Sequence, residues 1–161
     1  MSEHNTEKPQ VTDVVVRISR CAKVVKGGRR FSFSALVVAG DGHGTVGIGL
    51  GKAKEVPATI KKGQKKALKN LVKVHVADGT IPHAVKGRFG STTVLLFPAS
   101  VGTGVIACSA VRSVVEKAGV HNLLTKIHGS TNPVNVVKAT LNGLEQLKNK
   151  KEVERLRGVT I

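Results

Sequence analysis

The sequence predicts an α+β fold divided into two small domains, at residues 11–77 and 78–148. Apolar residues that alternate with other residues near the amino terminus predict paired strands, and a helix-length segment follows them at 55–73. A second series of strands and helices begins after the turn signal Asp78-Gly79. We expect residues 1–10 to form a flexible extension and residues 149–161 a charged, mobile tail.

The first domain opens with two strands joined by a basic turn. Apolar residues alternate along both strands, as Val14, Val16 and Ile18 and then as Phe31, Phe33, Ala35 and Val37. Glycine reaches φ > 0 without strain and leaves the backbone uncovered, so Gly27 and Gly28 predict a bare turn. Three cations then extend from the hairpin tip toward any approaching anion: Lys26, Arg29 and Arg30. Taken alone, the loop also fits an ordinary solvated hairpin. Phe31 and Phe33 share the apolar face, so we expect both in the core.

A third strand is predicted after the glycine-rich turn at 40–44. Its apolar residues alternate with glycines, so one face lacks side chains and a helix or another backbone can approach it closely; the glycines are Gly47, Gly49 and Gly51. The spacing of Gly42, Gly44 and Gly47 matches the dinucleotide fingerprint, but that motif opens a helix and a strand is expected here.

The predicted helix at 55–73 carries a lysine-rich face. Pro57 is tolerated near its start, and Ile60, Ala67 and Leu71 lie within about 40° of one another at 100° per residue. A separate arc of roughly 140° holds Lys61, Lys62, Lys65, Lys66, Lys69 and Lys73. A solvated face whose lysine stems cover apolar surface is one explanation. Like charges at i, i+4 repel, however, so a bound polyanion would stabilise this helix.

The second domain is predicted to contain strands at 81–90 and 92–98, a helix, a strand at 123–127 and a last helix. The first helix has apolar positions at Val111, Val114, Val115 and Ala118, with Gly119 as its C-terminal glycine. Residues 129–133 offer an N-cap and a proline at the first position of the last helix, whose apolar stripe is Val134, Val137, Leu141 and Leu144.

The charge balance predicts a polyanionic partner. The 161 residues hold 26 Lys and Arg against 10 Asp and Glu, a formal charge of +16. Residues 11–77 contain fourteen cations and three acids, so the first domain is the better candidate for nucleic-acid contact. Trp and Tyr are absent, and base stacking on single strands needs aromatic faces. We therefore expect folded or double-stranded nucleic acid, held by its phosphates and its shape.

Other function classes find little support in the composition. Cys21 and Cys108 are far apart and form no CxxC motif, and no two histidines have the i, i+4 spacing of a metal pair. We expect no metal, no cofactor, no disulfide and a reducing compartment. The uncharged segment 89–111 is interrupted by Pro98, Gly102 and Gly104, so we expect no membrane span.

Seven segments in uninterrupted order over about residues 12–148 resemble the bacterial-type small-subunit ribosomal protein five family. They are residues 25–36, 38–51, 51–57, 79–83, 98–107, 118–122 and 129–137. The resemblance implies a first domain similar to a double-stranded-RNA-binding domain and a second domain of strand-strand-strand-helix-strand-helix order. It also implies a structural, non-enzymatic role in the small ribosomal subunit that supports assembly, messenger-RNA entry and translational accuracy.

The resemblance implies a set of partners as well. These are small-subunit ribosomal RNA and ribosomal proteins four and eight, with protein three nearby at the messenger-RNA entry. We expect a cytoplasmic, ribosome-bound protein with no small-molecule substrate, although the loop from Lys23 to Arg29 would lie beside the spectinomycin site. Gly104 and Arg112 match positions that contact protein four. The chain departs from the family pattern at Val101 and at Cys108-Ser109, which bears on the detail of that contact.

Fifteen residues are expected to bind RNA. They are Arg17, Arg20, Lys23, Lys26, Gly27, Gly28, Arg29, Arg30, Lys52, Lys54, Lys61, Lys62, Lys65, Lys66 and Lys69. Two other functions stay open at this point. One is a nucleotide phosphotransferase, for which the carboxylates that would bind Mg²⁺ are scattered; the other is a free-standing RNA chaperone or other basic nucleic-acid-binding protein.

Overall fold

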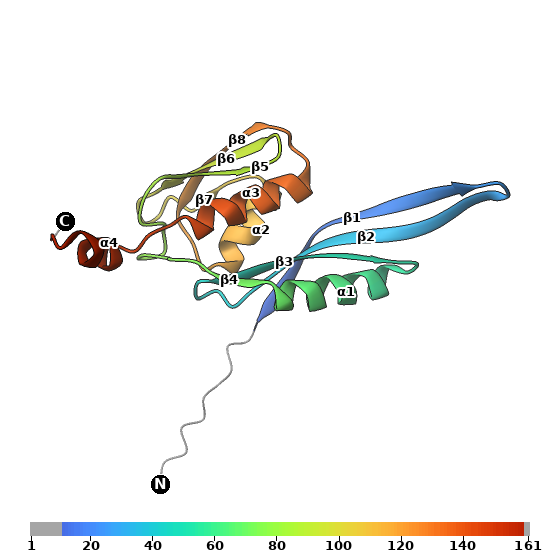
Figure 1. Ribbon diagram of the computed structural model, residues 1–161, viewed down its shortest axis with the longest axis horizontal. Helices are drawn as coiled ribbons and strands as arrows, with labels where there is room; N and C mark the ends of the chain where they lie inside the picture. Colours follow the sequence, from blue (N-terminus) through green and yellow to red (C-terminus); the bar gives the residue numbers. More distant parts are fainter. Residues whose placement is uncertain (1–10, 160–161) are drawn as a thin grey trace, which may run out of the picture.

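The computed structural model describes residues 11–159, and the extension expected at 1–10 lies outside the described residues. The chain stacks in four layers (Figure 1). Helix α1 (Val56–Lys69) covers one face of the first four-stranded sheet. Helices α2 (Ser109–Lys117) and α3 (Pro133–Glu145) lie between that sheet and a second four-stranded sheet. The α+β class is confirmed.

The first sheet is antiparallel, in the order β1-β2-β3-β4. Its strands are β1 (Thr12–Val25), β2 (Gly28–Gly40), β3 (Thr45–Ala53) and β4 (Leu71–Lys73). The helix expected to continue to residue 73 ends at Lys69 instead, because Leu71 to Lys73 pair with the start of β3. Lys73 and Leu71 therefore belong to a strand and not to the lysine-rich helix.

A β-bulge in β1 changes which residues share a face. The register shifts by one residue between Val15 and Arg17, and one extra residue turns all later side chains to the other face. Val14 lies opposite Val38 whereas Ile18 lies opposite Ala35. The expectation that Val14 and Ile18 share one apolar face is therefore wrong.

The glycine face of β3 receives helix α1, as the alternation of glycines predicts. A Cβ atom on Gly49 would lie 2.6 Å from the Ala67 amide nitrogen, and one on Gly51 would lie 2.7 Å from that of Gly63. The helix residues buried against the sheet are Thr59, Gly63 and Ala67. The expected apolar stripe of Ile60, Ala67 and Leu71 is thus only partly right. Ala67 packs on the sheet as expected, but the contact is made by small residues at i, i+4 spacing, which let the two backbones meet.

Strand β2 is buried on both faces from Ala35 to Gly40. Val37 faces Gly63 of α1, whereas Leu36 and Val38 belong to the same buried cluster as Val111 and Val114 of α2. One continuous core therefore joins the two sheets, which suits domains too small to bury much surface separately.

The second sheet has the order β5-β6-β8-β7, with β7 parallel to β8. Its strands are β5 (Val85–Phe89), β6 (Thr92–Pro98), β7 (Val105–Ile106) and β8 (Leu123–Gly129). With α2 and α3, this is the expected order of three strands, helix, strand and helix. Strand β7 lies between the Gly102–Gly104 loop and α2, which begins at Ser109.

The predicted helix ends of the second domain are confirmed. Gly119 follows α2 with φ of 86°, a backbone conformation that glycine adopts without strain. Asn132 is the N-cap of α3, its side chain accepts a hydrogen bond from the Val134 amide at 3.3 Å, and Pro133 opens the helix. The conformation at both ends is thus fixed by local sequence.

The carboxyl-terminal segment contains a helix instead of the mobile tail expected at 149–161. Helix α4 (Lys150–Arg157) includes an i, i+4 ion pair of 3.9 Å between Lys150 Nζ and Glu154 Oε1. It lies at the end of the molecule opposite the β1–β2 hairpin tip (Figure 1). Within residues 11–159, no helix combines the length and apolar character needed to cross a membrane.

Candidate nucleic-acid interface

The β1–β2 hairpin projects beyond the rest of the molecule as a two-stranded ribbon (Figure 1). Val25 pairs with Gly28, so Lys26 and Gly27 form the turn. Gly28 has φ of 135° while Gly27 stays outside the positive region, so only one of the two glycines needs its conformational freedom. A Cβ on either would meet nothing within 4 Å, and the tip is bare, as expected.

The hairpin cations are divided between the two sides of this ribbon. Residues directly opposite each other in an antiparallel pair share a face, and Lys23 lies opposite Arg30 while Val24 lies opposite Arg29. Continuing the register along β2 puts Arg29 on the α1 side and Arg30 on the side of the second domain. All three cations are exposed. The ribbon can therefore meet anions on both sides at once.

Phe31 is not a core residue, contrary to the expectation from its alternation. Its side chain is 49% exposed, and the Arg20 guanidinium lies over its ring at 4.6 Å from the centroid. Phe33, one pleat closer to α1, is half-buried. The reason is that the hairpin extends beyond the helix that covers its base (Figure 1). Arg20 is thus held on an aromatic face near the ribbon cations.

Arg17 lies at the base of the ribbon, on the side of the second domain. It lines a small cavity of about 40 Å³ together with Leu36, Pro133 and Val134, where β2 passes the start of α3. Its side chain remains exposed. Arg17 is thus separated from the hairpin tip by most of the length of the ribbon.

Four lysines of α1 and one of β3 line a shallow depression of about 320 Å³. They are Lys52, Lys62, Lys65, Lys66 and Lys69, and each is exposed. Lys54 and Lys61 are exposed as well but do not line it. Lysine stems can form an apolar wall while the ammonium groups stay in water. The structure thus gathers five of the expected RNA-binding residues in one place, and keeps them apart from the hairpin tip.

The basic residues of the ribbon and of α1 lack acidic partners. Between residues 11 and 159, the structure records no ion pair for any of the fifteen residues expected to bind RNA. Their positive field is therefore not neutralised within the described part of the chain. Unpaired clustered cations attract polyanions and raise the rate of encounter with them.

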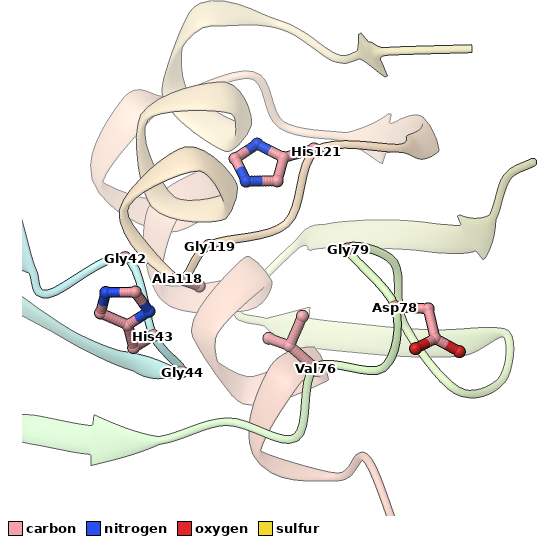
Figure 2. A pocket seen from close by; sticks show the side chains of 9 residues that line it. All are labelled: Gly42, His43, Gly44, Val76, Asp78, Gly79, Ala118, Gly119 and His121. Atoms are coloured by element: carbon pink, nitrogen blue, oxygen red, sulfur yellow. The ribbon is translucent and has the colours of Figure 1, made fainter. Parts of the chain in front are cut away.

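The two sheets are joined by a loop-to-helix contact made of backbone atoms. The Gly42 amide donates to the Lys117 carbonyl at 3.0 Å, and the Gly44 amide donates to the Ala118 carbonyl at 3.0 Å. This contact borders a crevice of about 430 Å³, where His43, Asp78 and His121 come from three separate segments (Figure 2). The contact needs glycine, since a Cβ on Gly119 would collide with the Gly42 carbonyl.

Asp41 organises the loop that makes this contact. Its carboxylate accepts hydrogen bonds from the amides of His43 at 2.8 Å and Thr45 at 2.9 Å. Partial burial by itself would raise the pKa of Asp41, but the hydrogen bonds from His43 and Thr45 outweigh this, so the pKa lies below its ordinary value of 3.8. Asp41 therefore supports the loop best when it is ionised.

Gly104 and Arg112 come together on the surface of the second domain. The Arg112 Nη2 atom donates to the Val105 carbonyl at 3.0 Å. The amides of Gly102 and Gly104 both donate to Asn122 Oδ1 at 3.1 Å. Asn122 is a positioning residue that sequence reasoning did not single out, because the loop it supports is twenty residues away.

An exposed apolar row lies beside this loop. Phe97 pairs with Leu124, which pairs with Ile106 across the sheet. All three side chains are at least 38% exposed, and Val101 of the adjoining loop is 86% exposed. Exposed apolar side chains that adjoin one another are typical of protein contact surfaces.

A basic ribbon, a lysine-faced helix and a second domain with an exposed apolar edge are features typical of two-domain nucleic-acid-binding proteins that also contact other proteins. Comparison with known families gives two matches. Residues 11–75 match the model described as ribosomal protein S5, N-terminal domain, and residues 87–157 match ribosomal protein S5, C-terminal domain. The chain belongs to the ribosomal protein S5 family.

Curated relatives agree with this assignment. A protein of Syntrophobacter fumaroxidans named small ribosomal subunit protein uS5 is 61% identical over 149 residues, covering 92% of this chain and 90% of the relative. The protein of that name from Tolumonas auensis is 50% identical over 161 residues, covering 100% and 97%. The one from Rubrobacter xylanophilus is 57% identical over 152 residues, covering 94% and 76%. The protein is a structural component of the ribosome and not an enzyme.

Proposed function

We propose that this protein binds small-subunit ribosomal RNA through two basic surfaces of its first domain and contacts neighbouring ribosomal proteins through its second. The observation that carries the proposal is the projecting ribbon, whose exposed cations have no acidic partners among residues 11–159. Its role is structural. The RNA is held by its phosphates, and the interface between the two domains limits the relative motion of the parts of the subunit that the two domains contact.

The ribbon supplies the first RNA surface. Arg30 and Lys23 on one side and Arg29 on the other allow contact with phosphates from two directions. An arginine can bind a phosphate through two parallel hydrogen bonds, whereas a lysine acts as a point charge. We infer that the ribbon tip lies between RNA segments. By the family resemblance, the loop from Lys23 to Arg29 would then lie beside the spectinomycin site.

The lysine depression on α1 supplies the second RNA surface. Five ammonium groups around one shallow hollow fit a phosphate backbone that tracks along the helix. Like-charge repulsion between lysines at i, i+4 is relieved when counterions or phosphates are bound. RNA binding should therefore stabilise α1 as well as hold the domain in place.

The second domain supplies the protein contact. Gly104, Arg112 and the exposed Val101 lie at one edge of the second sheet, next to the row of Phe97, Leu124 and Ile106. We infer that this edge contacts ribosomal protein four, with protein eight a further neighbour and protein three nearby at the messenger-RNA entry. In this arrangement the protein acts in the cytoplasm as part of the small subunit.

The test is the salt dependence of binding to a small-subunit ribosomal RNA transcript. Each phosphate neutralised contributes roughly 0.7 to 0.9 to the log–log slope, so removing three contacts by Lys26→Ala, Arg29→Ala and Arg30→Ala should flatten the slope by about 2 to 3. The control removes the same charge from the far end, by Lys148→Ala, Arg155→Ala and Arg157→Ala. An unchanged slope in the hairpin variant would exclude the ribbon as a phosphate contact.

A fractionation distinguishes the ribosomal role from that of a free-standing RNA chaperone. We expect the native protein to sediment with small subunits in a lysate. A protein that stays in the free fraction at low salt would contradict the proposal.

A further inference from the structure

The open face of the second sheet carries cations that the ribbon and α1 do not account for. Helix α3 covers the other face: a Cβ on Gly87 would lie 2.7 Å from the Gly143 amide nitrogen. Side chains alternate between the faces of a strand, so the residues on either side of Gly87 point away from α3. These are Lys86 and Arg88, and both are exposed.

The pairing of the three neighbouring strands arranges these cations in two rows. One row runs from Lys86 through Leu95 to Lys126, and the other runs from Arg88 through Thr93 to His128. Residues directly opposite share a face, so all six side chains lie on the open side. Neighbouring strands are about 4.8 Å apart and residues two apart along a strand about 6.7 Å. The four basic residues therefore form a rectangle of roughly 10 by 7 Å at the backbone.

The centre of the rectangle suits a polar, elongated anion. Leu95 and Thr93, the middle residues of the two rows, are half-buried, so they leave space above the central strand, and the Thr93 hydroxyl can donate to an oxygen there. Strands β5, β6, β7 and β8 contain no Asp or Glu, so nothing on this sheet neutralises the cations.

We propose that this open face is a third RNA-binding surface, independent of the ribbon and of α1, which holds backbone phosphates between Lys86, Arg88, Lys126 and His128. The charge argues for RNA over a protein partner, because a sheet without acidic residues that carries three cations and a histidine at the corners of the rectangle is complementary to a polyanion. The apolar row of Phe97, Leu124 and Ile106 lies at the other end of the same face, so protein contact and RNA contact are segregated along the strands.

The position of the rectangle fits a joint attachment with the ribbon. The β5–β6 turn and the end of β8 lie on the side of the molecule toward which the β1–β2 hairpin projects (Figure 1). When two surfaces of one protein bind the same RNA, binding at one surface raises the effective concentration of that RNA at the other. Loss of the sheet contacts should therefore weaken binding even when the ribbon is intact.

The test uses the full-length chain and a small-subunit ribosomal RNA transcript. The sheet variant carries Lys86→Gln, Arg88→Gln and Lys126→Gln; the control carries Lys148→Gln, Arg155→Gln and Arg157→Gln, with the same loss of charge. We expect the sheet variant to flatten the log–log salt slope by about 2 relative to the control. A slope equal to that of the control overturns the inference. Circular dichroism and thermal melting identical to wild type exclude a folding defect in these exposed positions.

A crosslinking experiment identifies the partner directly. A photoreactive benzoylphenylalanine placed at position 126 is incorporated into reconstituted small subunits and irradiated. Crosslinks to ribosomal RNA support the inference, whereas crosslinks to a ribosomal protein alone overturn it. Because this inference goes beyond the proposed role of the ribbon, the two fail separately: the hairpin variant tests the first domain and the sheet variant tests the second.

Discussion

Replacing Gly49 by alanine tests the packing that positions the lysine-faced helix. The Cβ of Gly49→Ala would lie 2.6 Å from the Ala67 amide nitrogen and closer still to the Gly63 carbonyl oxygen. Both are backbone atoms inside α1, so no side-chain rotation relieves the collision. The helix must lift away from β3, which also disturbs the packing of Val37 on Gly63.

The magnitude follows from two opposing terms. Overpacking of a well-packed core costs typically about 1 to 3 kcal/mol, and a collision with backbone places Gly49→Ala near the upper end. Alanine also restricts the unfolded chain, which stabilises the fold by about 0.4 to 1 kcal/mol. The net loss is about 2 kcal/mol in the free energy of unfolding, and for a chain of this length the melting temperature should fall by roughly 4 to 8 °C.

The assay is thermal and urea unfolding of the full chain. Gly27→Ala is the matched control, because a Cβ there meets nothing within 4 Å and its φ lies outside the positive region. We expect the control to melt with the wild type or slightly above it. If Gly49→Ala also melts with the wild type, the close approach of α1 to β3 is not what holds this helix in place.

Three further predictions concern single contacts, each measured by unfolding of the full chain. Gly63→Ala should destabilise because its Cβ would lie 2.7 Å from Val37 Cγ2; adding Val37→Ala should recover part of the loss in a double-mutant cycle, and strict additivity would contradict this. Asp41→Asn should be less stable than wild type, and the difference in the free energy of unfolding should be constant above about pH 4 and shrink at lower pH. The reason is that the pKa of Asp41 is lowered in the folded protein, so its stabilising charge is lost as the pH falls through that folded-state pKa. A difference that grows as the pH falls would contradict this. Asn122→Ala should cost about 1 to 3 kcal/mol, since it leaves the amides of Gly102 and Gly104 without their acceptor; a change within experimental error would show that water replaces it.

Much of the candidate site could be predicted from local patterns. The turn chemistry and alternation around Gly27-Gly28 predicted the ribbon, and the spacing of the lysines predicted a basic face on α1. Neither required knowledge of distant contacts, because hairpin and helix formation depend on neighbouring residues. The gathering of Lys52 with the α1 lysines and the cation rows of the second sheet could not be predicted, because they depend on how strands far apart in sequence pair.

The sequence by itself determined the element types, the helix caps at Asn132 and Gly119, and the bare face of β3, because these depend on backbone preferences and on which residues lack side chains. Only the tertiary structure decided which surfaces cover one another. Phe31 is exposed because the ribbon extends beyond the end of α1. Leu71 belongs to a strand and not to the helix because it pairs with the edge of β3. The bulge at Val16 turned Val14 and Ile18 to opposite sides, since one added residue reverses the alternation that follows it.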